Sequence, residues 1–373
     1  MAGLTVWARD ANRQRRGILK VVRAEALLTE SGVGTFTMTV DGRDKLSGRL
    51  TEDWGVIVMD GKEQVFTGNI DSLGQSTKGR TSNLELVGVT DMVVLEDRIT
   101  YPDPTKEATA QNTVTHYKRT GPGEALLAEL INTQAGPQAI AARRTPGLRA
   151  VPTGTRGKRT VVEARFTPLL DEVKSLALAA GLVVDVAQVR DSRDLAVEVR
   201  VPVDRSRSVR FMPATGLGEY STRTAQATVS AVIVGAGGQG TARKVVERTQ
   251  ASQRRIERFQ DRRDSMDDEE LVKAAAETLA EGVATASAEF KVSELGRYRF
   301  GEHYRLGDVV AVQPAPGVQV VDRVRAVSIK WTPTGRDVQV TVGENTADPQ
   351  KVPAQVLKVR KLQQQLRRIG AAQ

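Results

Sequence analysis

The segment Val56–Phe66, VIVMDGKEQVF, decides the fold class of this chain. Two apolar runs flank Asp60-Gly61, and both of these residues tolerate the positive φ that a two-residue hairpin turn requires. Before this hairpin, the segment GTFTMTV (Gly34–Val40) alternates apolar residues with threonine, which is the period of a half-buried strand. Such closely spaced strands with short turns predict a small β-barrel or sandwich. Further strands are expected at Gln64–Ile70 and Asn83–Val89.

A helix followed by a hairpin is predicted in the middle of the chain. Thr167 can cap the helix, Pro168 suits its first position, and Gly181 suits its left-handed end. The strands LVVDVAQV and LAVEVRV follow, joined by Asp191–Asp194. Together these segments indicate a compact α+β module. The apolar face of the helix is formed by Leu169, Leu170, Val173, Leu176, Ala177 and Ala180.

The remaining segments are again closely spaced strands or helices beside strands, so the expected fold class is mainly β with α+β parts. Helices are predicted at Gly121–Asn132 and Asp267–Gly282, and two strands around a Gly-rich turn at Thr228–Thr249. Strands resume from Ala288, and the basic Gly/Pro-rich stretch 143–158 is predicted to be a mobile loop.

These segments divide the chain into six expected parts. They are a β-barrel domain at 1–103, a helix plus basic loop at 104–165, an α+β domain at 166–250, a charged linker and helix at 251–287, a second β-barrel domain at 288–345, and a basic helix at 346–373.

The last part carries the only residues that the sequence proposes as an interface. Its apolar residues fall at 3-4-3 spacing, a seam barely two heptads long. A core-packed helix and a short coiled coil fit this pattern equally well, because two heptads seldom hold a coil together unaided. The candidate interface residues are Val359, Leu362, Leu366 and Ile369.

The composition excludes several classes of protein. Apolar residues make up 40% of the 373 residues but aromatics only 4%, so the cores must rest on Val, Leu, Ile and Ala. No apolar run reaches the roughly 18 residues of a membrane span. The N-terminus is charged where a signal peptide would be apolar, so we expect synthesis and assembly in a cytoplasm.

Few residues could carry catalysis or bind a metal. The chain has no cysteine and two histidines, His116 and His303, which excludes cysteine-ligated zinc and an HExxH helix. Neither histidine follows or precedes a nucleophile elbow. The acidic residues at 264–270 lack the order of an EF-hand loop and favour a helix start instead. We therefore expect no catalytic residue, no metal site and no cofactor.

The net charge of +9 permits a nucleic-acid partner but does not argue for one. The excess lies in 143–165 and in the tail after Pro349. These stretches lack the interleaved aromatics that stack on bases, and no zinc finger, RRM or helix-turn-helix signature is present. A mixed, solvated surface is the favoured interpretation.

The segment Gly235–Gly240, GAGGQG, is the sharpest enzymatic signal, because it matches GxGxxG directly after an apolar strand. This motif makes a dinucleotide-dependent enzyme the alternative function. The residues that follow favour another strand rather than a helix, and no acidic residue ends a second strand at the expected distance. A Gly-rich hairpin turn is therefore the favoured interpretation.

The order of segments resembles the hub, or tail-tip adaptor, proteins of long-tailed phages, especially the minor tail protein families of phages that infect actinobacteria. The resemblance extends over nearly the whole chain up to about Asn345, although each motif is degenerate. It rests on Gly34–Val40, Val65–Leu73, Leu84–Asp103, Val201–Ser221, Val232–Lys244 and Tyr304–Asn345.

This resemblance implies a homotrimeric structural protein of the virion without enzymatic activity. Two β-barrel domains per chain would close a pseudo-sixfold ring that joins the sixfold distal tail ring and tail tube to the central tip. The ring would frame the channel for the tape-measure protein and for DNA in transit. The expected partners are therefore other copies, the distal tail ring, the central tip or fibre protein and the tape-measure protein. A lytic domain of the kind that extends some relatives is not expected.

Overall fold

The computed structural model describes residues 3–79, 81–225, 227–238, 241, 243–252, 254–262, 268–282, 285–292, 297–316 and 318–343. The chain forms two units. The first contains Met1–Tyr220 and Glu289–Val342, and the second contains Ser221–Ala288. Residues 344–373, which include the predicted terminal helix with Val359, Leu362, Leu366 and Ile369, lie outside the described residues.

A 13-stranded sheet organises the first unit, and its strands come from both ends of the chain. Strands β13 (Arg210–Phe211) and β19 (Val309–Ala315) lie off its main path, where β13 pairs with β19 and β19 with β20. The main path runs β14 (Leu217–Ala225), β18 (Thr285–Val292), β21 (Gly335–Gly343), β20 (Val318–Thr332), β3 (Val21–Thr29), β4 (Thr35–Asp41), β7 (Thr81–Thr90), β6 (Glu63–Lys78), β5 (Gly55–Asp60), β1 (Leu4–Arg9) and β2 (Arg15–Ile18).

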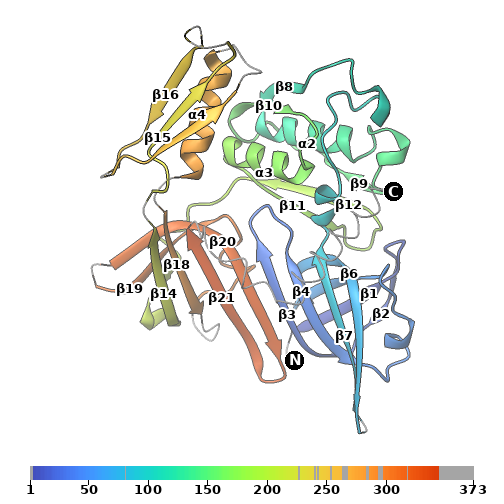
Figure 1. Cartoon of the computed structure of the whole chain (residues 1–373). Helices are drawn as coiled ribbons and strands as arrows, with labels where there is room; N and C mark the ends of the chain where they lie inside the picture. The colour runs from blue at the N-terminus through green and yellow to red at the C-terminus, as the bar shows by residue number, and fades with distance from the viewer. Residues whose placement is uncertain are drawn as a thin grey trace. The chain divides into compact units, whose positions relative to one another are not determined.

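Strand β3 joins the two ends of the chain, because it pairs with β4 on one edge and with β20 on the other. In Figure 1 the red strands β20 and β21 therefore lie beside the blue strands β3 and β4. The expectation of two closed barrels is wrong for the described residues. The strand order is an open path whose ends are β14 and β2, because the edge of β3 that a separate N-terminal barrel would use is occupied by β20.

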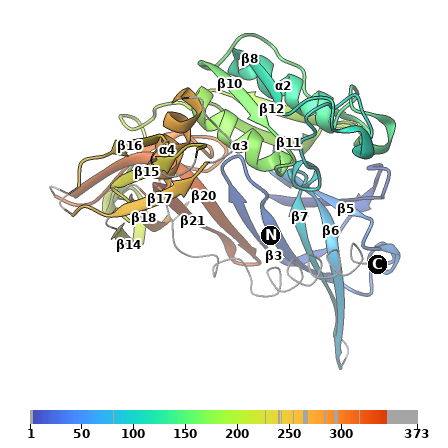
Figure 2. The ribbon, with the colours of Figure 1, turned by 45° about the horizontal axis from the view of Figure 1, so that its top comes forward.

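The predicted hairpin around Asp60-Gly61 is confirmed as β5–β6, with Gly61 at φ 61°. Strand β6 is long, and its pairing with β7 continues to Lys78↔Thr81, beyond the point where the pairing of β4 with β7 ends. Figure 2 shows this end of β6 and β7 extending past the neighbouring strands as a two-stranded ribbon.

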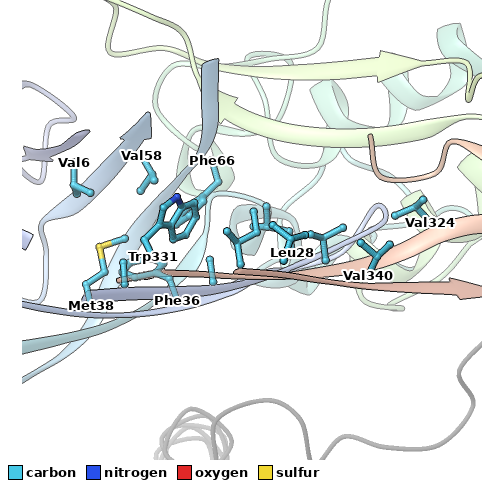
Figure 3. Close-up of a cluster of buried hydrophobic side chains, with 14 of the residues drawn as sticks. Val6, Leu28, Phe36, Met38, Val58, Phe66, Val324, Trp331 and Val340 are labelled. Carbon is cyan, nitrogen blue, oxygen red and sulfur yellow. The ribbon is translucent and has the colours of Figure 1, made fainter. Parts of the chain in front are cut away.

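One hydrophobic core unites the N-terminal and C-terminal strands of the sheet. Figure 3 shows Trp331 of β20 in the same cluster as Phe36, Met38 and Phe66. The rings of Phe36 and Phe66 lie 5.5 Å apart, within the range in which aromatic pairs add stability beyond their buried area. Trp331 is only 2% exposed. Strands from the two ends of the chain therefore share one packed core.

A second core in the first unit belongs to an α+β module whose helices cover short sheets. The predicted helix is confirmed as α3 (Leu169–Ala180), and Gly181 ends it at φ 72°. Thr167 does not cap it, because Pro168 occupies the N-cap position. The Thr167 hydroxyl donates to the Glu172 carboxylate and does not accept a hydrogen bond from a backbone N–H of the first turn. The other elements are α1 (Val93–Glu96), β8 (Tyr117–Pro122), α2 (Gly123–Gln134), β9 (Leu148–Arg149), β10 (Arg159–Ala164), β11 (Val183–Gln188) and β12 (Leu195–Arg200).

Short 3-10 helices complete the first unit. They are η1 (Ser47–Arg49), η2 (Ala108–Ala110), η3 (Ala141–Arg143) and η4 (Pro213–Thr215).

The second unit is a three-stranded sheet with one helix. Strands β16 (Val245–Thr249) and β17 (Glu257–Asp261) flank β15 (Ala231–Gly235), and α4 (Asp268–Glu281) supplies the apolar residues Leu271, Ala275 and Leu279 to their core. The antiparallel pair β15–β16 confirms the two predicted strands. Among the described residues, no helix has both the length and the apolar character to cross a membrane.

The aromatic core sets a strict requirement at Gly88 of β7. A Cβ atom at this position would lie 2.4 Å from the Phe36 ring and 2.1 Å from the Asn69 carbonyl oxygen. We expect Gly88→Ala to lower the free energy of unfolding by about 1–3 kcal/mol through overpacking, measured by chemical denaturation. Gly74→Ala on the adjacent strand is the matched control, because its Cβ would meet nothing closer than 3.9 Å. Equal stability of the two variants would contradict this view of the core.

Candidate functional site

The junction between the sheet and the α+β module is built around a buried ion pair. Arg9 on β1 is fully buried, and its Nη1 donates to Asp91 Oδ2 at 2.9 Å and to Gln188 Oε1 at 2.7 Å. Asp91 follows β7, and Gln188 ends β11. One guanidinium therefore joins three segments that are far apart in the sequence.

The polar groups around this pair are satisfied by further hydrogen bonds. Thr67 on β6 donates its hydroxyl hydrogen to Asp91 Oδ2 at 2.5 Å and accepts the backbone N–H of Gln188 at 2.8 Å. Asn69 Oδ1 accepts from Arg9 Nη2 at 2.9 Å. Removing two charges from water is costly unless such bonds replace the lost hydration. The network therefore ties the module to the sheet in one orientation.

Asp308, ahead of β19, forms a second buried node. It is 1% exposed and accepts hydrogen bonds from Arg200 Nη1 at 3.1 Å, from Arg205 Nε at 3.0 Å, and from the backbone N–H groups of Val203 and Arg305. Arg200 ends β12 of the α+β module. The carboxylate thus fastens the exit of the module to the C-terminal strands.

Asp60, in the turn of the β5–β6 hairpin, forms a third node. Its carboxylate accepts from Arg299 Nη2 at 3.0 Å and from Arg336 Nη1 at 2.6 Å. Both arginines belong to the C-terminal part of the chain. Glu30, which follows β3, is paired in the same way with Arg323 and Arg325. The N-terminal turns are therefore held to the C-terminal strands by charge as well as by strand pairing.

A cavity of about 680 Å³ lies between these nodes and is called the junction cavity here. Its walls come from the turns after β3 and β5, from one face of β11 and β12, and from the segment 299–306. The lining is mixed. Apolar side chains include Val65, Phe66, Val183, Ala187, Phe300 and Leu306, and carboxylates include Glu63, Asp185, Glu198 and Glu302.

Two of the carboxylates face each other across the strands of this wall. Asp185 on β11 is the register partner of Glu198 on β12, an arrangement that places like charges side by side. Burial raises the pKa of the Asp185 carboxyl to about 6, and the charge of Glu198 acts in the same direction. Protein atoms surround Asp185, yet both side chains remain accessible to solvent from the cavity.

The described residues do not assemble a catalytic or metal-binding group. Three or more His, Asp or Glu side chains placed to hold a metal ion are not found among them. His303 Nδ1 accepts from the backbone N–H of Arg299 at 3.1 Å, and His116 lies 3.8 Å from the Glu163 carboxylate. The two histidines therefore belong to local contacts rather than to a triad.

The dinucleotide alternative at Gly235–Gly240 is wrong in its structural context. The motif leads from β15 into β16, a strand, where a nucleotide-binding loop would open a helix. A Cβ at Gly235 would lie 2.7 Å from the Arg243 guanidinium, which donates hydrogen bonds to the carbonyl oxygens of Gly235 and Ala236. This glycine makes room for a side chain of the same hairpin and not for a pyrophosphate.

The basic stretch 143–158, which the sequence predicts to be a mobile loop, makes several specific contacts in the structure. Arg143 is 8% exposed, donates to Gln134 Oε1 at 3.1 Å, and lies 3.6 Å from the centre of the Tyr101 ring. Arg156 pairs with the buried Glu124 at 2.7 Å and lowers the pKa of that carboxyl far below its ordinary value. Leu148–Arg149 also forms strand β9.

Sequence reasoning missed the residues that hold the junction. Arg9, Asp91 and Asp308 look like ordinary surface charges in the sequence, and no local pattern marks them as buried. The interface residues that the sequence did propose, Val359–Ile369, lie outside the described part of the chain.

Comparison with known proteins places this geometry among phage tail proteins. The family model described as Siphovirus ReqiPepy6 Gp37-like protein matches residues 4–344. No curated protein matches the sequence.

Among solved structures, the chain is similar to the 43 kDa tail protein of prophage MuSo2 from Shewanella oneidensis, with TM-score 0.58, 13% identity, and 91% of this chain and 97% of that chain covered. It is also similar to a tail protein from Neisseria meningitidis MC58, with TM-score 0.55, 13% identity, and coverage of 92% and 97%. The prophage tail protein gp18 from Listeria monocytogenes EGD-e gives TM-score 0.54, 13% identity, and coverage of 96% and 99%. At this identity the likeness concerns the fold.

The ion pair at Arg9 gives a test of the junction. We expect Arg9→Met to lower the free energy of unfolding by about 3–5 kcal/mol, because it leaves Asp91 buried without a counter-charge. Adding Asp91→Asn should recover part of this loss, since the two side chains act as one unit. Chemical denaturation measures both effects.

The matched control for this test is Arg149→Met, which breaks the exposed pair with Asp194 and should cost under about 1 kcal/mol. A loss at Arg9 no larger than at Arg149 would refute a structural role for the node.

The raised pKa of Asp185 predicts a pH dependence of stability. The folded chain holds this proton more tightly than the unfolded chain, whose aspartate pKa is 3.8, so deprotonation opposes folding. The gain in Tm of Asp185→Asn over the native chain should therefore grow as the pH rises from about 4 through 6, and then level off. Thermal unfolding of both proteins across this range measures it. A constant difference would contradict the prediction.

Proposed function

Since the chain belongs to the Siphovirus ReqiPepy6 Gp37-like protein family, we propose that it is the structural hub of a phage tail tip. It works as a homotrimeric adaptor between the sixfold distal tail ring, with its tail tube, and the central tip. The ring of three copies frames the channel for the tape-measure protein and for DNA in transit. It resides in the virion after synthesis in the host cytoplasm.

The observation that carries this proposal is the sheet shared by the two ends of the chain. A subunit that matches sixfold to threefold symmetry must present similar β surfaces twice, in a fixed relation to each other. Strand β3 and the buried nodes at Asp60 and Asp308 supply this rigidity within the first unit. The open ends of the strand order, β2 and β14, leave strand edges for neighbouring chains.

The partners follow from this position in the tail. Other copies of the chain form the ring, the distal tail ring and tape-measure protein meet it from the tube side, and the central tip or fibre protein meets it from the other. The apolar seam Val359, Leu362, Leu366 and Ile369 is proposed to dock on a neighbouring tip protein. The proposed role depends on complementary shape and on surface buried at interfaces, so it requires no catalytic residue, metal or cofactor.

Native mass spectrometry of the purified chain tests the subunit count and bound small molecules together. We expect a trimer with a mass close to three times 40.4 kDa and no retained nucleotide. Cryo-electron microscopy of the corresponding virions should place the chain at the tail tip in threefold copy number. Virions that lack the chain, or a monomer or dimer that carries a mass of the size of NAD, would overturn the hub proposal.

A further inference from the structure

Phe166, between β10 and α3, combines two features that are unfavourable for a surface aromatic residue. Its backbone has φ 52°, a left-handed conformation that bulky residues seldom adopt, and its side chain is 43% exposed. Such strain persists where the surroundings impose it, and it concentrates at functional positions. Here the surroundings are hydrogen bonds, because the N–H of Phe166 donates to the Thr100 carbonyl and the N–H of Thr100 donates to the Thr167 carbonyl, both at 2.8 Å.

Phe166 belongs to a stack of two aromatic rings that has an arginine at each end. The Tyr101 ring meets Phe166 edge-on at 6.2 Å, and the buried Arg143 guanidinium lies on Tyr101 at 3.6 Å. Arg165, which is exposed, lies 5.7 Å from the Phe166 ring. The exposed end of this stack, Arg165 and Phe166, is called the knob here. A pre-organised aromatic residue beside an arginine is the composition of an interface hot spot.

The junction cavity has the complementary chemistry. Phe66, Phe300 and Leu306 offer apolar walls, and Asp185 and Glu198 are exposed to the cavity. Among the described residues, neither of these two carboxylates forms an ion pair, whereas Arg200 and Arg299 on the same walls are engaged by Asp308 and Asp60. A volume of about 680 Å³ is within the usual range of pockets that hold a compact ligand.

We propose that the knob of one copy inserts into the junction cavity of a neighbouring copy, with Phe166 among the apolar walls and Arg165 beside Asp185 and Glu198. This inference deepens the proposed homotrimeric hub and rests on it. The contact is between copies because the knob residues do not line the cavity of their own chain. Knob and cavity are different surfaces, so the contact is heterologous, and repeating it generates a closed ring or an open filament.

The absence of cysteine from the chain allows a cross-linking test without background. Two positions are chosen for cysteine substitution. Ile99 is 44% exposed and lies beside the knob, where it forms an isolated β-bridge with Pro168. Ala187 lines the cavity. Copies with Ile99→Cys are mixed with copies with Ala187→Cys and treated with a short bismaleimide. The expected result is a cross-linked dimer of the two variants. The control replaces Ile99→Cys by Val151→Cys, which is 68% exposed and lies in another segment. Equal yields from the two mixtures would overturn the proposal.

A second substitution separates binding from folding. Phe166→Gly in the Ile99→Cys background should abolish the cross-link while Tm stays the same or rises, because glycine accepts the left-handed backbone. The charge reversal Arg165→Glu should reduce the yield several-fold, and Asp185→Arg on the other copy should restore it. A cross-link that survives Phe166→Gly would sink the proposal.

The outcome also distinguishes this inference from the hub proposal. A trimer in native mass spectrometry without the selective cross-link refutes the knob contact and leaves the hub standing, with a different tail protein as the occupant of the cavity. Absence of a trimer together with absence of the chain from virions refutes the hub itself.

Discussion

Buried carboxylates set the constraint on which the first unit depends. Asp91, Asp308, Asp60 and Glu30 each lie at a place where the chain passes from one segment to another, and each is engaged by arginine. A buried charge tolerates only those arrangements that bring its partners within hydrogen-bonding distance. Hydrophobic packing alone would allow the module to slide on the sheet, whereas these bonds select one placement. The junction cavity keeps its shape for the same reason.

Local chemistry made much of the fold predictable. Asp60-Gly61 and Gly181 readily adopt the backbone conformations of a turn and of a helix end. The hairpin and the end of α3 could therefore be predicted from a few neighbouring residues. The single open sheet that replaces the two expected barrels could not be predicted, because strand pairing between distant segments leaves no local signal. Leu27 pairs with Ser328, and nothing near either residue indicates the other. The alternation that predicted strands at both ends is the same whether they form two sheets or one.

The candidate site was harder to predict than the fold for a related reason. Arg9 and Asp308 occur in sequence contexts that suit surface charges, and only the folded chain removes them from water. The glycine motif misled for the opposite reason. Its local pattern is strong, but nucleotide binding also requires that a helix follows the motif, and here a strand follows it. Arg243 gives Gly235 a packing role that spacing alone does not express. Contacts that form only in the folded chain thus decide both which charges become buried and what the glycines make room for.

The pairing of β3 with β20 has a consequence for the order of synthesis. Residues near position 26 emerge from the ribosome long before their partners near position 329. Until then β3 has an unsatisfied edge, and contacts of such long sequence separation form slowly. A truncated chain lacks the strand that completes the sheet and so cannot present a finished surface. The sheet of the first unit can therefore be completed only after the C-terminal strands have been translated.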